Sequence, residues 1–586
     1  MNEPQDLNDP SLRDRAVTAA RGDAPFDLLI TGATLADVVT GERRAADIGL
    51  IGALIASVHV PGTRSDAIET LDATGLIAAP GLIDSHMHVE SSMITPETYA
   101  SAVLPRGVTT VVWDPHEFGN VAGVAGVEYA LDCAARSNLR ILPLAPSCVP
   151  SAPGYESTGA DFDAEIIDRL MQKDGIVGLA EVMDMSAVVS RDPRMRSILE
   201  AAMGSGKLIC GHARSLNGAA LQAYAAAGVT SDHEITSAED LLEKLRAGLT
   251  IELRGSHPYL LADFAKVLQG LPQMPPTVTF CSDDVFPDDL LATGGVDHMA
   301  RLMIGHGLDP MRALQAATLN AAIRLDRRDI GLIGPGKRAD IVLFKDLQAL
   351  EAVHVLRNGA VIAKGETSEF PEAFLKTCDL APLVPEDFEI AARGPKARLA
   401  TIAKPRFTEW GAVTIDVQNG VVQVPNAVTR IAVINRYGAR DAKPRVGLLQ
   451  HWGAWNGAFA TTVSHDSHNL TVFGGNTADM ALAANAVVQA GGGMAVAQGG
   501  VITALLPLPV AGLVSAKPLA EVASEFAQVR DAMGEVVAWN PPYLTFKALV
   551  GATLACNAGP HQTDLGIADS HAGILLASPV LEEGLV

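Results

Sequence analysis

The chain has 586 residues, which is long enough for two or more domains with sizeable cores. Its 67 acidic residues outnumber its 44 basic residues and give a net charge of −23, so we expect no nucleic-acid partner. The six cysteines are widely spaced and form no C-x-x-C pair, which argues against a zinc knuckle or a disulfide framework and predicts a cytoplasmic protein.

The sequence pattern also predicts that the protein does not associate with membranes. The first six residues are polar and acidic, and no basic or apolar segment of a signal peptide follows them. The most apolar run, residues 501–516, is interrupted by Pro507 and Pro509 and falls short of the roughly 18 to 20 apolar residues of a membrane span. We expect this run to form buried strands.

Strand-like and helix-like segments alternate through much of the chain. Residues 1–24 are expected to form a helical or loose N-terminal arm, and residues 25–80 short strands with turn glycines. From residue 81 to 329, apolar strands alternate with helical segments, which predicts βαβ units and an α/β fold of the closed (β/α)8 TIM-barrel type. The expected helices include residues 216–227, 238–247 and 260–270, and the eight expected strands are residues 83–85, 109–113, 140–144, 176–180, 207–210, 230–232, 250–253 and 278–282.

The first barrel strand runs directly into the sequence His86-Met87-His88. Side chains at i and i+2 of a strand share one face and lie roughly 7 Å apart, so these two imidazoles can converge on one metal ion. An HxH motif alone is a weak signal. It gains weight because strands four, five, six and eight also end in residues of metal-ligand type, which are Glu181, His212, His233 and Asp283.

These strand ends meet at one mouth of a closed barrel, which predicts a binuclear metal site. His86, His88 and Asp283 would hold one ion, and His212 and His233 the second. Glu181 is the strand-end carboxylate placed to bridge both ions, and a hydroxide between them would have a pKa close to neutral. Asp283 could accept the proton of this hydroxide and return it to a leaving group. Histidine and carboxylate ligands suit zinc, manganese and iron alike.

Longer motifs around these ligands resemble the amidohydrolase superfamily over about residues 25–370, and within it the adenine deaminases. The motifs are DSHMHVESSM at 84–93, WDPHE at 113–117, CSDD at 281–284, SHDSHN at 464–469 and GGN at 474–476. Many members bridge their metals with a carboxylated lysine. Glu181 at the bridging position argues against the urease, dihydroorotase and hydantoinase branches. The resemblance implies hydrolysis of free adenine to hypoxanthine and ammonia, in purine salvage or catabolism, with two manganese or ferrous ions, zinc being the alternative.

The resemblance also implies how the remaining segments are organised. Residues 25–80 and 330–375 would pair into one composite β-sandwich beside the barrel. Residues 385–586 follow a shift in composition and are expected to form a separate α+β domain of the adenine-deaminase type, with strands in 411–417, 430–435 and 471–474 and a helix over 477–490. This domain could cap the barrel mouth or form a subunit interface, and we expect a homo-oligomer, namely a dimer.

Deamination of a purine needs a second proton donor besides Asp283. The candidates are Glu90, His116, Glu117 and Asp284. We assign Glu117 a catalytic role and the other three roles in binding the substrate. With Asp114, the cluster around Glu117 could instead hold an additional metal ion or form a solvated loop network. The pair His465 and His468 has the spacing of metal ligands but lacks a third strong ligand nearby in the sequence.

Three hypotheses for the function follow. The first is an adenine deaminase, and the second is another amidohydrolase that acts on a cyclic amide or an aminated heterocycle. The third is a non-catalytic assembly protein that has kept the barrel. All six predicted ligand positions are intact, which counts against a non-catalytic protein. Glu181 and the motif at residues 89–93 favour an adenine deaminase over another amidohydrolase.

Overall fold

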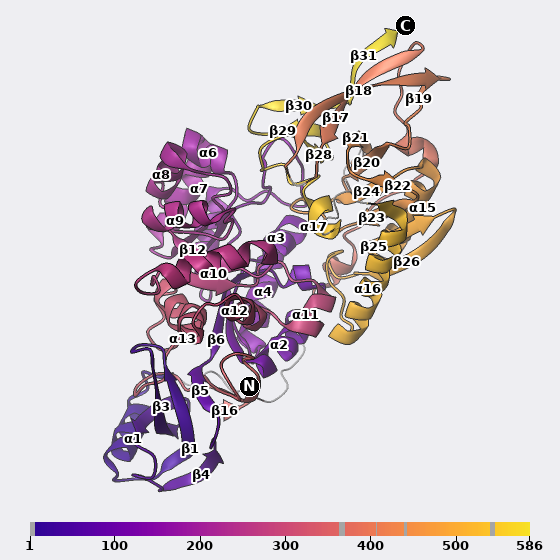
Figure 1. Cartoon of the computed structure of the whole chain (residues 1–586). Helices are drawn as coiled ribbons and strands as arrows, with labels where there is room; N and C mark the ends of the chain where they lie inside the picture. The colour runs from indigo at the N-terminus through magenta and orange to yellow at the C-terminus, as the bar shows by residue number, and fades with distance from the viewer. Residues whose placement is uncertain (1–5, 363–369, 406, 439–441, 539–544) are drawn as a thin grey trace.

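The computed structural model describes residues 6–362, 370–405, 407–438, 442–538 and 545–586. Figure 1 shows three parts along the chain, with a small sheet in indigo, a helix-surrounded barrel in purple and magenta, and a sheet-rich part in orange and yellow.

The central part is the predicted (β/α)8 barrel. Sheet pairing connects β6, β7 and β8, then β9 and β10, and then β11, β12 and β13, all in parallel. Parallel bridges from Ala145 to Leu179 and from Met87 to Asp283 join these groups, and a hydrogen bond from Thr230 N to Ile209 O joins β10 to β11. The strands are β6 (Leu82–Met87), β7 (Val108–Trp113), β8 (Arg140–Pro143), β9 (Gly178–Val182), β10 (Leu208–Gly211), β11 (Ser231–Asp232), β12 (Thr250–Arg254) and β13 (Val278–Cys281).

Helices follow the strands and cover the outside of the barrel (Figure 1). Helix α9 shows why the sequence forms them: the side chain of Ser237 caps its N-terminus, acidic residues lie in its first turn, and Lys244 and Arg246 lie in its last turn, as the helix dipole favours. The three helices predicted between residues 216 and 270 are confirmed as α8, α9 and α10. The bounds are α2 (Pro96–Val103), α3 (His116–Ala122), α4 (Val124–Arg136), α5 (Ala164–Met171), α6 (Met185–Ser190), α7 (Pro193–Gly204), α8 (Gly218–Ala226), α9 (Ala238–Arg246), α10 (Leu261–Gly270), α11 (Pro287–Thr293), α12 (Val296–Gly305), α13 (Pro310–Gln315) and α14 (Ala321–Arg324).

Two segments that flank the barrel in the sequence form one eight-stranded sheet. Strand β5 pairs antiparallel with β14, so that Ala78 lies opposite Leu343. Helix α1 (Pro10–Arg21), from the predicted N-terminal arm, buries Leu12 and Ala16 against this sheet and so forms part of its core. Residues 363–369 of the predicted second segment lie outside the described residues. The strands are β1 (Phe26–Asp37), β2 (Glu42–Ile51), β3 (Leu54–His59), β4 (Ala67–Asp72), β5 (Ile77–Pro80), β14 (Ile341–Phe344), β15 (Ala352–Arg357) and β16 (Ala360–Val361).

The C-terminal part is a separate sheet-rich domain built on a ten-stranded sheet. Its central strands follow the order β21-β20-β24-β23-β25, and helices α15 (Thr477–Gln489) and α16 (Leu519–Val536) pack against β25 and β26. The strands of this sheet are β17 (Lys396–Ala403), β18 (Glu409–Gln418), β19 (Val421–Val422), β20 (Val428–Ile434), β21 (Arg445–Gln450), β23 (Ala458–Thr461), β24 (Leu470–Gly474), β25 (Gly493–Gln498), β26 (Val501–Pro507) and β31 (Val580–Leu585). Smaller elements are β22 (Ala454–Trp455), β27 (Val537–Ala538), β28 (His561–Thr563), β29 (Gly566–Asp569), β30 (Ile574–Leu576) and α17 (Thr545–Val550).

Strand β26 corrects the expectation that residues 501–516 are buried throughout. It lies at one end of the ten-stranded sheet, and the side chain of Val501 is 60% exposed while Leu506 is fully buried. An edge strand faces the core with alternate residues only, so a continuous apolar run does not have to be buried on both faces.

The C-terminal domain packs against the mouth of the barrel. Arg530 on α16 forms an ion pair with Asp288 on α11, with Nε and Oδ2 2.9 Å apart. Next to this pair, the rings of Phe286 and Phe526 stack with centroids 5.2 Å apart. On the other side, Asn469 donates a hydrogen bond to the carbonyl oxygen of Ser157. The barrel mouth and the C-terminal domain therefore share one interface.

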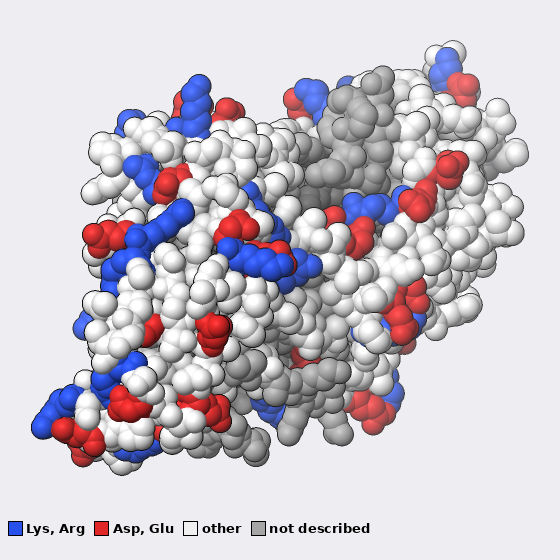
Figure 2. Space-filling view, turned by 60° about the horizontal axis from the view of Figure 1, so that its bottom comes forward, with Lys and Arg blue, Asp and Glu red and all other residues white. Residues whose placement is uncertain are grey.

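Charged side chains of both signs lie interspersed on the face shown in Figure 2. Exposed ion pairs of this kind contribute roughly 0 to 1 kcal/mol each, so the buried apolar clusters carry most of the stability. Among the described helices, none combines the length and the apolar character needed to cross a bilayer.

A buried ion pair joins the barrel to the small sheet. Arg140 on β8 hydrogen-bonds to Asp340, and both residues are less than 10% exposed. Replacing Arg140 with Met would leave the Asp340 carboxylate buried without this partner, so we expect the free energy of unfolding to fall by about 3 kcal/mol. The control is Arg136→Met, which removes an exposed pair with Asp132 and should cost less than about 1 kcal/mol. Denaturant titration measures both values, and equal losses would contradict a structural role for this pair.

Candidate functional site

The ends of five barrel strands place the six predicted metal ligands in one buried cluster. Each lies at or just after its strand end, and each is at most 4% exposed. The residues are His86 and His88 from β6, Glu181 from β9, His212 after β10, His233 after β11 and Asp283 after β13.

The carboxylate of Glu181 lies between two pairs of histidines. Its Oε1 is 3.8 Å from His86 Nε2 and 3.5 Å from His88 Nε2. Its Oε2 is 2.6 Å from His212 Nδ1 and 3.2 Å from His233 Nε2. His116 Nδ1 is also 3.7 Å from Oε1, so each oxygen faces a different group of imidazoles, an arrangement in which a carboxylate is able to bridge two cations.

The carboxylate of Asp283 also presents its two oxygens to different neighbours. Oδ1 is 3.5 Å from His88 Nε2, whereas Oδ2 accepts hydrogen bonds from Arg254 Nη1 at 2.8 Å and Ser256 Oγ at 2.9 Å. Arg254 was not among the predicted site residues. It lies at the end of the seventh strand, so the strand-end rule that found the six ligands could also have identified it.

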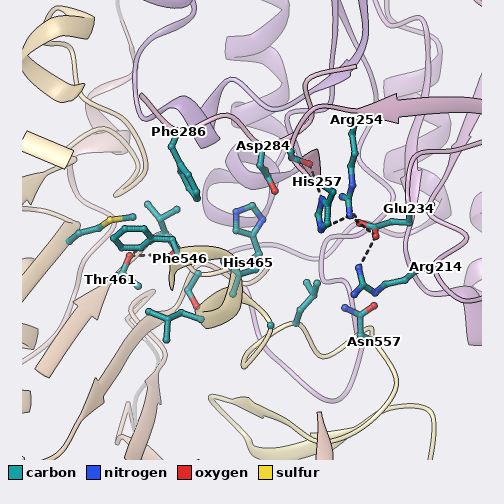
Figure 3. A pocket seen from close by; sticks show the side chains of 18 of the residues that line it. Arg214, Glu234, Arg254, His257, Asp284, Phe286, Thr461, His465, Phe546 and Asn557 are labelled. Atoms are coloured by element: carbon teal, nitrogen blue, oxygen red, sulfur yellow. Dashed lines mark hydrogen bonds and ion pairs between the residues drawn. The ribbon is translucent and has the colours of Figure 1, made fainter. Parts of the chain in front are cut away.

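Charges alternate outward from Asp283. Arg254 also pairs with Glu234, with Nη1 and Oε1 2.6 Å apart, and Glu234 pairs in turn with Arg214. Burial alone would raise the pKa of Glu234, but the two guanidinium groups hold that pKa well below its usual range. Figure 3 shows this row of side chains along one wall of a cavity.

Imidazoles and carboxylates in the cluster shift the pKa values of one another. Burial, together with the nearby His233 and His88, lowers the pKa of His86 well below its usual value, so its ring is neutral. Burial would lower the pKa of His88 and of His233, but Asp283 raises the first well above its usual value and Glu181 raises the second to about 9. Burial would raise the pKa of Glu181, but the surrounding imidazoles lower it well below its usual range. Metals bind neutral imidazoles and ionised carboxylates, so a bound ion would displace the protons of His88 and His233.

Several buried ring nitrogens in this cluster have no hydrogen-bond partner among the described residues. They are His86 Nδ1 and Nε2, His116 Nδ1 and Nε2, His212 Nε2 and His233 Nδ1. An unsatisfied buried polar atom costs roughly 1–3 kcal/mol, so a cluster of them needs a further partner. Divalent cations fit this donor set of histidine nitrogens and carboxylate oxygens.

The predicted substrate residue Glu90 lies in the protein interior. Its Oε2 accepts a hydrogen bond from Trp113 Nε1 at 2.8 Å, and its Oε1 accepts one from the backbone N of Phe118. Burial and the nearby Glu117 raise the pKa of Glu90 to about 8. Both oxygens thus serve the packing of β7 and α3, and Glu90 is not among the residues that line the cavity described below, so its predicted contact with substrate stays a prediction.

The other predicted residues lie closer to the mouth of the barrel. His116 is buried, with Nδ1 3.2 Å from Asp114 Oδ2 and Nε2 3.7 Å from Asp466 Oδ1. Ser91 Oγ lies 2.5 Å from Asp284 Oδ1 and 3.2 Å from Glu117 Oε1, so it connects Asp284 with Glu117.

The structure supplies the partner that the pair His465 and His468 lacks in the sequence. Glu117 Oε1 lies 3.3 Å from His465 Nε2. The two residues are 348 positions apart, and only the packing of the C-terminal domain on the barrel brings them together. No spacing rule within the chain could have identified this contact.

A cavity of about 290 Å³ lies between the barrel mouth and the C-terminal domain. Its polar wall includes Arg254, Asp284 and His465, and its apolar wall includes Phe286 and Phe546 (Figure 3). An aromatic wall opposite a few polar groups is typical of a site for a small planar molecule. Together with the metal-type ligands beneath it, the cavity suits metal-assisted hydrolysis.

Binding of a divalent ion should stabilise the protein, because it supplies partners to the unsatisfied ring nitrogens. For chelator-treated protein, we expect Mn²⁺ at 100 times its Kd to add about 2.7 kcal/mol to the free energy of unfolding. His86→Asn should abolish most of this gain, whereas His306→Asn, at an exposed position, should keep it. Differential scanning calorimetry with and without Mn²⁺ measures the effect, and an equal gain in both variants would contradict the ligand assignment.

Comparison with known proteins agrees with this geometry. Residues 77–365 match the model of the amidohydrolase family, and residues 405–573 match the model of the adenine deaminase C-terminal domain. The two matches cover the barrel and most of the sheet-rich domain that packs on its mouth.

Full-length relatives show the same likeness. The chain is 59% identical to a protein named adenine deaminase 2 from Rhizobium meliloti, over 99% of both chains. It is 50% identical to an adenine deaminase from Klebsiella pneumoniae, over 95% of this chain and 94% of that one. It is 38% identical to an adenine deaminase from Moorella thermoacetica, over 89% and 90% of the two chains.

Proposed function

Because the chain belongs to the adenine deaminase family, we propose that it hydrolyses free adenine to hypoxanthine and ammonia. The observation that carries this proposal is the position of Glu181 between two pairs of histidines, beneath a cavity with an aromatic wall. Adenine is flat and neutral, and such a cavity suits its shape and polarity.

Membership of the family implies a divalent metal, and we propose two ions per chain. His86, His88 and Asp283 would hold one ion, His212 and His233 the other, and Glu181 both. Manganese or ferrous iron is our proposal for the native metal, with zinc as the alternative. When bound, such ions lower the pKa of a water molecule and so supply a nucleophile at neutral pH.

Asp283 is the proposed proton carrier. Arg254 and Ser256 occupy its Oδ2, so Oδ1 remains to take a proton from the attacking water and pass it to the departing amine. The net balance is that one proton of water leaves with ammonia and the other stays on the hypoxanthine ring. Arg254 holds this carboxylate in one orientation throughout.

The remaining assignments follow from the cavity. Asp284 lines it, which supports the proposed contact with the purine. Glu117 and His116 are buried behind its wall, so each acts through a neighbour: Glu117 through His465, and His116 through Asp114 and Asp466.

Other properties are proposed on narrower grounds. The net charge of −23 supports a substrate other than nucleic acid, and we propose purine salvage or catabolism as the role. The six cysteines are widely spaced in the sequence and form no C-x-x-C pair, which supports a cytoplasmic location. A homodimer is our proposal for the quaternary structure.

The first experiment measures turnover of adenine by protein that has been stripped of metal and reloaded with Mn²⁺, Fe²⁺ or Zn²⁺. Loss of adenine absorbance with release of ammonia would support the proposal, and the metal that restores most activity would indicate the native one. Turnover of dihydroorotate or hydantoin, without turnover of adenine, would instead favour the alternative of a cyclic-amide hydrolase.

Glu181→Gln should lower metal content and turnover together, because the amide carries no charge to offset two cations. We expect kcat/KM to fall at least 100-fold and bound metal to fall below two ions per chain. Glu128→Gln is the matched control, since Glu128 is half-exposed on α4 and forms an ion pair with Lys173 at the surface. Metal analysis and adenine turnover on the same samples give the result. Full metal and full rate in Glu181→Gln would disprove the bridging role.

Asp283→Asn should lower kcat by about 10³-fold, because general acid–base groups contribute roughly 10²- to 10⁴-fold and Asn cannot carry the proton. Asp326→Asn, at a side chain that is 83% exposed, serves as the control and should leave kcat unchanged. Steady-state kinetics with a melting curve separates lost chemistry from lost folding. Retained turnover in Asp283→Asn would remove this residue from the proton-transfer role.

A further inference from the structure

We propose that His465, which the C-terminal domain supplies, is a catalytic residue that donates a hydrogen bond to a ring nitrogen of the purine. Glu117 is its positioning residue. Addition of water to the carbon that bears the amine places negative charge on the ring nitrogens, and a fixed cation beside them stabilises that charge. This inference rests on the proposed deamination of adenine and assigns it a residue from outside the barrel.

His465 reaches the cavity, whereas Glu117 does not. The side chain of His465 is 12% exposed and forms part of the cavity wall, while that of Glu117 is 1% exposed and lies behind it. Figure 3 shows the ring of His465 below Asp284, between the polar row and the aromatic side chains. A purine in this cavity would therefore contact the imidazole of His465 and not the carboxylate of Glu117.

Two carboxylates hold the imidazole of His465 in place. Its Nε2 lies 3.3 Å from Glu117 Oε1, and its Nδ1 lies 3.6 Å from Asp466 Oδ1. Burial would lower the pKa of His465, but Glu117, Asp466 and Asp284 outweigh it and raise the pKa to about 9. The ring is thus a cation with two N–H donors at neutral pH. The Nε2–H faces Glu117, whereas Nδ1 lies beyond hydrogen-bond distance of Asp466, so the Nδ1–H is the donor left for a ring nitrogen of the purine.

His465 supplies a hydrogen-bond donor and Asp284 an acceptor on the same wall of the cavity. Ser91 Oγ donates to Asp284 Oδ1 at 2.5 Å and also approaches Glu117, which links the two positions. The cation of His465 suits a ring nitrogen that accepts, and the carboxylate of Asp284 suits a ring N–H that donates. Adenine has both kinds of nitrogen, so this pair can orient the ring as well as stabilise its charge.

The same geometry argues against a further metal ion at Glu117, His465 and His468. The ring of His468 accepts a hydrogen bond at Nδ1 from the backbone N of Ser464. The neutral ring then carries its proton on Nε2, which leaves no free nitrogen lone pair to bind a cation. Glu117 and His465 alone are too few ligands for such a site.

The test compares His465→Gln and His465→Asn with the wild-type, full-length enzyme loaded with Mn²⁺. Both variants should keep the wild-type number of ions per chain and the wild-type melting temperature within a few degrees. We expect kcat for adenine to fall about 100-fold, as when one donor to a transition-state charge is removed, and KM to rise less than 10-fold. His306→Gln, at an exposed histidine of the barrel, is the matched control.

Glu117→Gln tests the positioning role. It should lower kcat with little change in KM, and the double variant Glu117→Gln/His465→Gln should be no slower than His465→Gln alone, because both changes remove one function. Independent, multiplicative losses in the double variant would overturn the link between the two residues.

Other outcomes would overturn the role of His465. Wild-type kcat in both His465 variants would show that the imidazole does not act in the reaction. Loss of one bound ion in proportion to activity would make His465 a metal ligand instead. Failure of the wild-type enzyme to act on adenine with any metal would contradict the proposed function itself, and with it this role.

Discussion

The carboxylate of Glu181, buried among five imidazoles, is the interaction on which the rest of the structure depends. A buried charge is costly unless opposite charges or hydrogen bonds compensate it. His212 and His233 lie 2.6 Å and 3.2 Å from one oxygen, and the compensation of the other oxygen requires that further strands deliver their histidines to the same point. Only a closed barrel brings the ends of β6, β9, β10 and β11 together in this way. The closed barrel and the buried carboxylate of Glu181 therefore both require that these strand ends meet at one point.

From this cluster outward to the cavity, buried side chains of opposite charge also lie next to each other and compensate one another. Asp283, Arg254 and Glu234 form a continuous series in which each buried charge has an oppositely charged neighbour within 3 Å. Such a series fixes side chains that would otherwise rotate, and it assigns different tasks to the two oxygens of Asp283. A proton carrier held in this way, as proposed for Asp283, does not have to reorient during the reaction. Arg254 thus serves the site through its hydrogen bond to Asp283.

The sequence was sufficient to predict the barrel and the convergence of six side chains of metal-ligand type, because both obey local rules. Each ligand follows a short apolar strand, and strand ends of a closed barrel converge wherever their residues lie in the chain. What the sequence did not show had other physical causes. Glu90 hydrogen-bonds to Trp113 at the end of β7 and to the backbone of Phe118 in α3, and its own place in the chain indicates neither contact. Strand β26 is apolar, yet its exposure depends on its place at the sheet edge. In both cases the outcome depends on contacts between segments that are far apart in the sequence, and the local sequence pattern does not encode such contacts.

The C-terminal domain explains why a barrel with its ligands in place is only part of the site. Loops at the barrel mouth contribute mainly charged and polar side chains to the cavity, whereas Phe459, Phe473 and Phe546 come from the C-terminal domain. A flat heterocycle needs an apolar surface to stack on, and a developing ring charge needs a fixed donor that water does not screen. The same domain provides the aromatic rings and His465. In the proposed reaction, its packing on the barrel therefore completes both recognition and catalysis, because the cavity has walls from both domains.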